Sequence, residues 1–267
     1  MLCGMFIDSH CHLSVPELRD RVGDILADMR AAKVDRALCI SITLEDFEDV
    51  HAIACAHDNL WATVGVHPDH EVPREPTVDE LVRLARREKV VAIGETGLDY
   101  YRLNGRSIAD MEWQRERLRV HVRAARETGL PLVVHTRDSG ADTLRLLREE
   151  KADTVGGVFH CFTDTAEVAR AALDLGFYIS FSGIITFKNA ADLRDVARAV
   201  PLERCLIETD SPYLAPVPHR GKTNSPALVP LVAAEMARLK GLSLETVAEA
   251  TSRNFERLFK IARTKVI

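Results

Sequence analysis

The sequence predicts an α/β protein, a (β/α)₈ TIM barrel that forms a single domain with additional C-terminal helices. Two observations lead to this prediction. Short apolar segments rich in β-branched residues alternate with amphipathic helical stretches along the chain, which is typical of βα units around a parallel sheet. The length of 267 residues is also close to the roughly 250 residues of one such barrel. The domain is expected to span residues 1–267.

The expected strands are almost entirely apolar and do not alternate with polar residues, as in a sheet that is buried on both faces. In order, they are Met5–Ile7, Ala37–Ser41, Leu60–Val66, Val90–Gly94, Leu132–His135, Gly157–His160, Tyr178–Ser182 and Cys205–Glu208. An open doubly wound sheet would give the same local pattern. No Gly-rich phosphate fingerprint follows the first strand, so the closed barrel is favoured.

The helical stretches between the strands have recognisable ends. Thr77 with Glu80, and Asp164 with Glu167, have the spacing of N-terminal caps. Three glycines stand where helices are expected to end, namely Gly129, Gly176 and Gly241. After the last strand the pattern predicts three helices that complete and cap the barrel, over Ala227–Lys240, Leu244–Ala250 and Arg253–Ile261.

Composition narrows the class of protein. The net charge of −5, from 35 basic and 40 acidic residues, excludes a global basic field of the kind that coats duplex DNA. The six cysteines contain no C-x-x-C pair, which argues against a disulfide framework or a zinc ribbon and favours a reducing compartment. No apolar run is long enough to span a membrane, and no signal-peptide core is present. We therefore expect a cytoplasmic protein without a membrane partner.

Side chains that can bind metal follow the expected strands, at the C-terminal end of the barrel, where the active sites of such barrels lie. They are the Asp8-Ser9-His10-Cys11-His12 segment, His67, Glu95, His135, His160 and Asp210. In an extended segment His10 and His12 project to the same face, about 7 Å apart along the chain, so they can converge on one ion. The pair alone would be weak evidence, but its coincidence with the other residues predicts a metal site.

Other histidines and cysteines are interpreted structurally. His51, His57 and His121 lie in expected helices, where surface or packing roles are the simpler account. Cys11 and Cys161 stand beside proposed ligands but alternate to the opposite side. We therefore expect them to be buried, unreactive thiols.

The motifs after the strands resemble those of the TatD family of metal-dependent deoxyribonucleases, within the amidohydrolase-like barrels. They are Asp8-Ser9-His10-Cys11-His12, Gly65-Val66-His67-Pro68, Gly94-Glu95-Thr96-Gly97-Leu98-Asp99, His135-Thr136-Arg137-Asp138, Phe159-His160-Cys161-Phe162, Glu208-Thr209-Asp210-Ser211-Pro212-Tyr213, and Arg220-Gly221-Lys222 with Asn224 and Pro226. The family usually places a second histidine directly after His-Pro, whereas Asp69 precedes His70 here. The role of His70 is therefore left open.

The resemblance implies two divalent metal ions, with Zn, Mn, Mg, Ni and Fe all compatible. The first ion would be held by His10, His12, Glu95 and Asp210, and the second by Glu95, His135 and His160. Glu95 would bridge the ions, and a solvent molecule between them would lose a proton near neutral pH and attack phosphorus. Asp210 and Glu95 are the expected catalytic residues, with Asp210 carrying the proton toward the leaving oxygen.

The activity implied by the resemblance is 3′–5′ exonuclease action on single-stranded DNA, so nucleic acid is the expected partner, as substrate, and no obligate protein partner is inferred. One alternative is an ester or amide hydrolase of the amidohydrolase type, acting on an aminoacyl ester, a lactone or a cyclic amide, because the ions would polarise a carbonyl equally well. A second alternative is a non-catalytic, metal-stabilised binding protein.

Several side chains near the expected mouth are candidates for holding phosphate. They are His67, Arg137, His219, Arg220 and Lys222, with Tyr100 and Tyr101 as candidates for stacking on a base. Several of them have a simpler interpretation. His67 could orient a metal ligand, Arg220 and Lys222 could be solvated loop charges, and the tyrosines could pack against a neighbouring loop.

Overall fold

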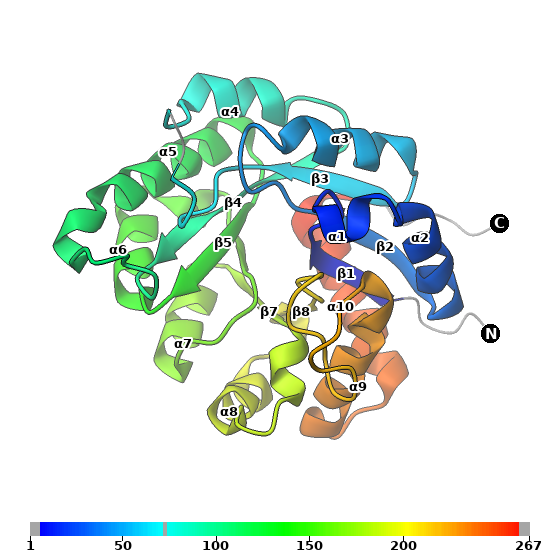
Figure 1. Cartoon of the computed structure of the whole chain (residues 1–267). Coiled ribbons are helices and arrows are strands. Elements are labelled where there is room, and N and C mark those ends of the chain that lie inside the picture. Colours follow the sequence, from blue (N-terminus) through cyan, green and yellow to red (C-terminus); the bar gives the residue numbers. More distant parts are fainter. Residues whose placement is uncertain (1–5, 72–73, 262–267) are drawn as a thin grey trace.

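The computed structural model describes residues 6–71 and 74–261, and within them eight parallel strands follow one another in sequence order around a nearly closed barrel (Figure 1). The strands are β1 (Phe6–Cys11), β2 (Val34–Cys39), β3 (Leu60–Val64), β4 (Val90–Asp99), β5 (Leu132–Arg137), β6 (Gly157–Phe159), β7 (Tyr178–Phe181) and β8 (Cys205–Ile207). The predicted fold class is confirmed. Met5, the first residue of one predicted strand, lies outside the described residues.

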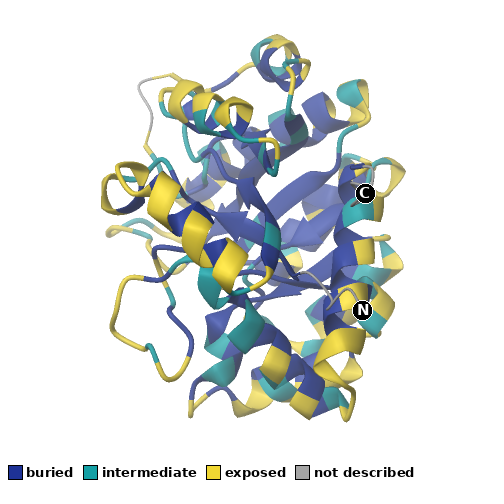
Figure 2. Ribbon diagram, turned by 90° about the vertical axis from the view of Figure 1, so that its right-hand side faces the viewer, coloured by how far each residue is buried: buried dark blue, intermediate teal, exposed yellow. Residues whose placement is uncertain are grey.

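Helices surround the barrel, with their exposed faces outward and the buried strands at the centre (Figure 2). The α-helices are α1 (Pro16–Arg19), α2 (Val22–Ala31), α3 (Phe47–Ala56), α4 (Val78–Ala85), α5 (Glu112–Thr128), α6 (Gly140–Glu149), α7 (Ala166–Asp174), α8 (Ala191–Ala199), α9 (Val229–Lys240) and α10 (Leu244–Phe259). Short 3₁₀ helices are η1 (Ile108–Met111), η2 (Ala152–Thr154), η3 (Gly183–Thr186), η4 (Leu202–Arg204) and η5 (Pro226–Leu228).

The barrel closes through residues that follow β8. The Asp210 N–H donates to the His10 carbonyl at 2.9 Å, and the His12 N–H donates to the Ser211 carbonyl at 2.8 Å. The buried Asp8 carboxylate accepts hydrogen bonds from the Thr209 N–H at 2.9 Å and the Thr209 hydroxyl at 2.5 Å. The same contacts that join β1 to the end of β8 therefore also fix three ligand-type residues.

The strand β4 extends beyond its predicted end at Gly94. Its pairing with β5 shifts register between Ile93 and Thr96 and then continues to Asp99. The ladder continues through Gly97, where a Cβ atom would lie 1.9 Å from the His135 carbonyl oxygen. Only glycine permits this approach. Glu95 therefore lies at an irregularity within the strand instead of at its end.

Two predictions about helices were wrong in detail. The predicted C-terminal helices Leu244–Ala250 and Arg253–Ile261 form the single helix α10, because the apolar face continues through the residues between them. The cap of α7 is Thr165, whose hydroxyl accepts from the Val168 N–H, and not Asp164. The predicted Thr77–Glu80 capping box at α4 is confirmed.

The interior of the barrel is filled by side chains from the strands and from α10. Phe255, Leu258 and Phe259 of α10 join a buried cluster with inward-facing residues of the strands. In Figure 1 this helix lies behind the strands, away from the viewer. Because α10 packs on one end of the barrel, the C-terminal strand ends are left to form a cavity.

Candidate metal centre

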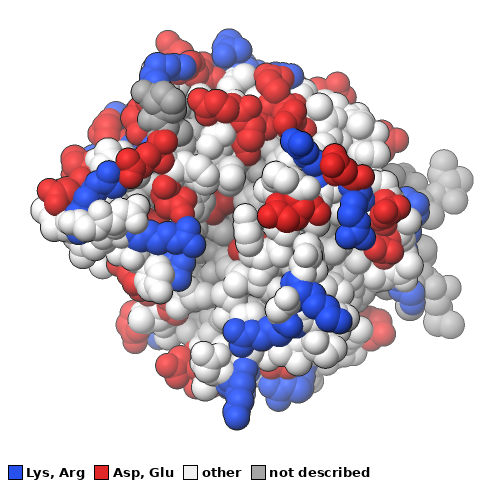
Figure 3. Space-filling model, in the orientation of Figure 1, with Lys and Arg blue, Asp and Glu red and all other residues white. Residues whose placement is uncertain are grey.

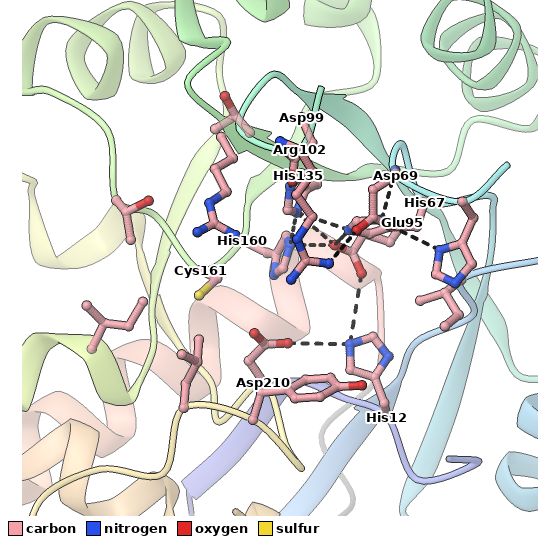
Figure 4. Close-up of a pocket in the computed structure, with 18 of the residues that line it drawn as sticks. His12, His67, Asp69, Glu95, Asp99, Arg102, His135, His160, Cys161 and Asp210 are labelled. Atoms are coloured by element: carbon pink, nitrogen blue, oxygen red, sulfur yellow. Dashed lines mark hydrogen bonds and ion pairs between the residues drawn. The ribbon is translucent and has the colours of Figure 1, made fainter. Parts of the chain in front are cut away.

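A cavity of about 680 Å³ lies at the C-terminal ends of the strands. Its wall includes five of the six proposed metal ligands, His12, Glu95, His135, His160 and Asp210, together with His67, Asp69, Asp99, Arg102, Arg137, Cys161 and Tyr213 (Figure 4). The sixth proposed ligand, His10, lies below this wall with no exposed surface. The structure therefore brings all six proposed ligands together from four strands, β1, β4, β5 and β6, or the residues directly after them, and from the segment after β8.

Glu95 is the centre of the cluster, and its two carboxylate oxygens face different groups of imidazoles. Oε2 lies 3.4 Å from His10 Nε2 and 4.0 Å from His12 Nε2. Oε1 lies 2.7 Å from His160 Nε2 and 3.2 Å from His135 Nδ1. This arrangement fits a carboxylate that is shared between two neighbouring sites.

Asp210 completes the side of the cluster formed by β1. Its Oδ1 atom lies 3.4 Å from His12 Nε2 and 3.6 Å from His10 Nε2. The alternation along β1 turns the Cys11 thiol the opposite way, where it donates to the Leu38 carbonyl. This direction of Cys11 agrees with the sequence interpretation.

His67 also belongs to the cluster. Its Nε2 atom lies 3.3 Å from Glu95 Oε1 and 3.3 Å from His135 Nδ1, while its Nδ1 atom contacts Asp69 Oδ1 at 2.5 Å. Asp69 also lies 3.2 Å from His70 Nδ1. Groups of donor atoms within 4.8 Å of one another are His10, His160 and Asp210; His10, His12 and Glu95; His67, Glu95 and His135; and His67, Asp69 and His70.

Two carboxylates orient the outer nitrogens of proposed ligands. Glu208 Oε1 lies 3.3 Å from His160 Nδ1 and accepts the Cys161 N–H at 2.7 Å. Asp99 Oδ2 lies 3.2 Å from His135 Nε2. The sequence motifs contained both carboxylates, but pairing them with a histidine required the fold. Such partners fix the ring orientation of metal-ligating histidines.

The electrostatics of the cluster follow from its burial and mixed charges. Burial would raise the pKa of Glu95, but the adjacent imidazoles, chiefly His160, His67 and His10, hold it well below the usual range. Burial likewise opposes ionisation of Asp210, whose pKa is nevertheless lowered, first by its hydrogen bond with His12. Both carboxylates are therefore ionised near neutral pH and available to bind cations.

Two histidines of the cluster have raised pKa values, because they lie beside these negative charges. Burial would lower the pKa of His67, but the Glu95 charge and the Asp69 hydrogen bond raise it to about 9. The pKa of His160 is raised well above its usual value because Glu95 and Glu208 outweigh burial. These directions describe imidazoles gathered around buried negative charge, where a cation is favoured.

The donor set fits divalent metal ions. The Nε2 atoms of His10 and His12 lie 3.2 Å apart, close to the separation of about 3.4 Å expected between two nitrogen ligands of one tetrahedral zinc ion. The Nδ1 atom of His10 is buried and has no hydrogen-bond partner within residues 6–71 and 74–261. Imidazole and carboxylate ligands together suit zinc, manganese, iron or nickel.

Some of the candidate substrate-binding residues line the cavity and others lie outside it. Arg137 and His67 line the cavity. Tyr100 is buried, and its hydroxyl donates to Asp142 at 2.6 Å, so its placement agrees with the packing interpretation. Arg220 is exposed and its guanidinium lies 4.0 Å from the centre of the Phe187 ring.

His219 is partly buried and Lys222 is exposed in the same loop as Arg220. In the part of the chain that the structure describes, these three residues stand outside the cavity wall. Basic side chains lie beside and below the central hollow of this face, and acidic ones are concentrated above it (Figure 3).

Three residues of the cavity wall differ from the sequence prediction. Cys161 was expected to face away, but it lines the cavity because it adopts a positive φ of 41° directly after β6. The residue is also partly exposed and not buried as expected. Enclosure of the thiol itself raises its pKa well above the usual value. The lack of reactivity stays a prediction. Arg102 and the 54% exposed Tyr213 line the cavity, although no role was predicted for either. An arginine shortly after the Glu95 strand was the available signal.

A parallel barrel with buried imidazoles and carboxylates at its C-terminal strand ends is the architecture of the metal-dependent hydrolases. Residues 7–260 match the family model described as TatD related DNase. The chain therefore belongs to the TatD family of metal-dependent hydrolases.

Individual relatives agree with this assignment. The chain is 49% identical over 264 residues to the uncharacterized metal-dependent hydrolase YcfH of Escherichia coli strain K12, with 97% of each chain covered. It is 34% identical over 251 residues to the 3′-5′ ssDNA/RNA exonuclease TatD of Citrobacter koseri, covering 92% of this chain and 95% of that one. The crystal structure of the TatD homologue YjjV from Escherichia coli K12 superposes with a TM-score of 0.86 at 28% identity, covering 98% and 100% of the two chains.

None of the helices within the described residues is both long enough and apolar enough to cross a membrane.

Proposed function

We propose that this protein is a two-metal phosphodiesterase that removes nucleotides from the 3′ end of single-stranded DNA. The observation that carries the proposal is the position of Glu95. Its Oε2 atom faces His10 at 3.4 Å and its Oε1 atom faces His160 at 2.7 Å. A carboxylate shared by two adjacent ions is the arrangement found in two-metal enzymes that cleave phosphate esters.

The proposed ligands divide between the two ions. The first ion would be held by His10, His12, Glu95 and Asp210, and the second by Glu95, His135 and His160. When bound, such ions supply positive charge for the phosphoryl oxygens and acidify solvent. His67, within 3.3 Å of Glu95, is a further candidate ligand or a contact for phosphate. Glu208 and Asp99 would hold the rings of His160 and His135 in place.

Asp210 is the proposed proton carrier. It lines the cavity, its side chain is 14% exposed, and its lowered pKa keeps it ionised near neutral pH. An ionised carboxylate at this place can accept the proton of the attacking water and pass it to the leaving oxygen. The 34% identity to the Citrobacter koseri exonuclease supports nucleic acid as the substrate.

The test is metal reconstitution with two substrate classes. Protein stripped by a chelator is restored with single divalent metals and given a 3′-labelled single strand, a 5′-labelled single strand and a panel of chromogenic carboxylic esters. We expect early release of the 3′ label, slower shortening of the 5′-labelled strand, and no release without metal.

Two results would contradict this proposal. Ester turnover without nucleotide release would assign the centre to a carbonyl substrate. Full metal loading without turnover on either class would favour a non-catalytic role. Glu95→Gln is the matched variant, because it keeps the size of the side chain while removing the charge that both ions would share.

A further inference from the structure

Arg102 lies in the connection between β4 and α5 and is tied to the metal centre through its backbone. Asp99 Oδ1 accepts the N–H groups of Tyr101 at 2.9 Å and Arg102 at 3.2 Å. The other oxygen of Asp99 contacts His135 Nε2 at 3.2 Å. The position of this loop is therefore fixed by the same carboxylate that orients a proposed ligand.

The side chain of Arg102 is held at the cavity but only partly paired. Its Nη1 atom donates to Asp69 Oδ2 at 3.0 Å, and the guanidinium points toward Asp69 in Figure 4. The side chain remains 60% exposed. Its Nε and Nη2 groups have no hydrogen-bond partner among residues 6–71 and 74–261, so they can bind a ligand in the cavity.

Arg137 stands beside this loop at the end of β5. Its backbone pairs with Asp99 in the sheet, and its carbonyl accepts the Tyr100 N–H at 2.9 Å. Its guanidinium stacks on the 61% exposed ring of Tyr101, 3.8 Å from the ring centre. In the described part of the chain no acceptor pairs with this guanidinium. A stacked, unpaired guanidinium offers its planar fork to phosphate or carboxylate oxygens.

We propose that Arg102 and Arg137 together bind a phosphate of the substrate that is not the one cleaved. The inference rests on the proposed phosphodiesterase function and names a specificity site for it. Asp69 stands between Arg102 and His67, so a phosphate held by Arg102 lies apart from the atoms around Glu95. The cavity of about 680 Å³ is within the range of pockets that enclose a drug-sized ligand.

The consequence is a preference for oligonucleotides over substrates that contain one phosphodiester. The test compares a single-stranded DNA decamer with thymidine 5′-(p-nitrophenyl phosphate), which has only the bond to be cleaved. We expect Arg102→Gln and Arg137→Gln each to lower kcat/KM for the decamer by about 10- to 100-fold, the effect of losing a hydrogen bond to a charged group. The loss on the single-phosphate substrate should be much smaller, so the ratio of the two kcat/KM values should fall.

Arg106→Gln is the matched control, because Arg106 belongs to the same loop but pairs with Glu71 at 2.8 Å and stands outside the cavity wall defined by the described residues. It should leave both substrates unaffected. Equal losses on both substrates in the Arg102 and Arg137 variants would overturn the proposal, since the arginines would then act on the cleaved phosphate or on folding. Unchanged decamer turnover in both would also overturn it.

A measurement of DNA binding without catalysis tests the arginine site independently of the proposed function. Anisotropy of a labelled decamer is measured with chelated, catalytically silent protein over a range of salt concentrations. Each of the two variants should weaken binding, and the double variant should reduce the slope of log K against log salt by about 0.7, the effect of losing one phosphate contact. If wild-type protein hydrolyses neither substrate, the proposed function fails, while unchanged affinity and slope in the variants would independently remove the arginine site.

Discussion

At the scale of single residues, the site depends on two carboxylates that remain ionised although they are buried. Glu95 is 2% exposed, and histidine nitrogens lie within 4.0 Å of both of its oxygens. Asp210 reaches the same cluster from the segment after β8 and also meets the cavity. Removing the charge of Glu95 should therefore have a different effect from removing the charge of Asp210. Glu95 contributes to both proposed ion sites, whereas Asp210 combines binding with proton transfer.

Asp210→Asn tests the proton carrier. We expect kcat on single-stranded DNA to fall by about 100- to 10,000-fold, the usual contribution of a general acid or base. Metal content, measured by elemental analysis of the same samples, should be largely kept, because the amide oxygen can still coordinate. The exposed Asp153→Asn should behave as wild type. Unchanged turnover in Asp210→Asn with intact metal would refute the role.

At the scale of elements, α5 supports the strand end that carries His67. The Val66 N–H donates to Nε2 of the buried His121 at 3.0 Å, and Nδ1 of His121 donates to the Arg117 carbonyl at 2.8 Å. Making both bonds at once requires a neutral imidazole, because Nε2 can accept the Val66 N–H only when it is unprotonated. Arg117 in turn donates to the carbonyls of His67 and His70. The packing role predicted for His121 thus has a specific form, in which the helix supports the β3 loop.

This support should depend on pH. Burial lowers the pKa of His121 from 6.5 to about 4. Below pH 6.5 the unfolded chain takes up a proton at this residue that the folded chain does not, so the unfolding free energy falls as the pH decreases. Between pH 6.5 and pH 4 the loss should be about 3 kcal/mol greater for wild type than for His121→Gln. Urea denaturation at a series of pH values measures the unfolding free energy of both proteins. If it changes with pH by the same amount in wild type and in His121→Gln, the effect is excluded.

The capping box of α4 gives a second prediction at this scale. The Thr77 hydroxyl accepts the Glu80 N–H, and the Glu80 carboxylate accepts the Thr77 N–H at 3.1 Å. Thr77→Ala should lower the unfolding free energy by about 1 kcal/mol because it leaves a helix donor without its partner. Chemical denaturation is the measurement. Thr77→Ser retains the hydroxyl and should stay close to wild type, whereas equal losses in both variants would point to the methyl group instead.

At the scale of the whole molecule, the proposed centre joins the first and last strands. Its residues come from β1, β4, β5, from the residue after β6, and from the segment after β8. Bound ions would therefore stabilise the closed barrel and not a single loop. Ligands that bind only the folded state raise its stability according to their concentration and affinity.

Metal removal should accordingly lower the melting temperature. An ion present at about 100 times its dissociation constant adds about 2.7 kcal/mol, and each kcal/mol corresponds to about 2–4 °C in a chain of this size. We expect a decrease of about 5–10 °C on chelation, measured by scanning calorimetry and reversed by added metal. Glu95→Gln should show a smaller decrease. An unchanged melting temperature after demonstrated metal loss would contradict the prediction.

The class of fold and the set of chemical groups could be predicted from the amino-acid sequence alone. Apolar runs at regular intervals predicted eight strands because a strand buried on both faces has little choice of side chain. His10, His12 and Glu95 were visible because ligand-type residues are unusual directly beside such runs. The C-terminal bounds of β4 and β5 were less accurate. Polar residues such as Glu95, Thr96 and Arg137 interrupt the apolar runs although the two strands continue to pair.

Which of these groups meet could be established only from the three-dimensional fold. It paired Asp99 with His135 and Glu208 with His160, brought His67 within 3.3 Å of Glu95, and turned Cys161 into the cavity. It also separated Arg102, in the cavity wall, from the exposed Arg220. These relations depend on strand register, loop direction and burial. Each of these is set by contacts between segments that are far apart in the sequence, which a local pattern does not contain.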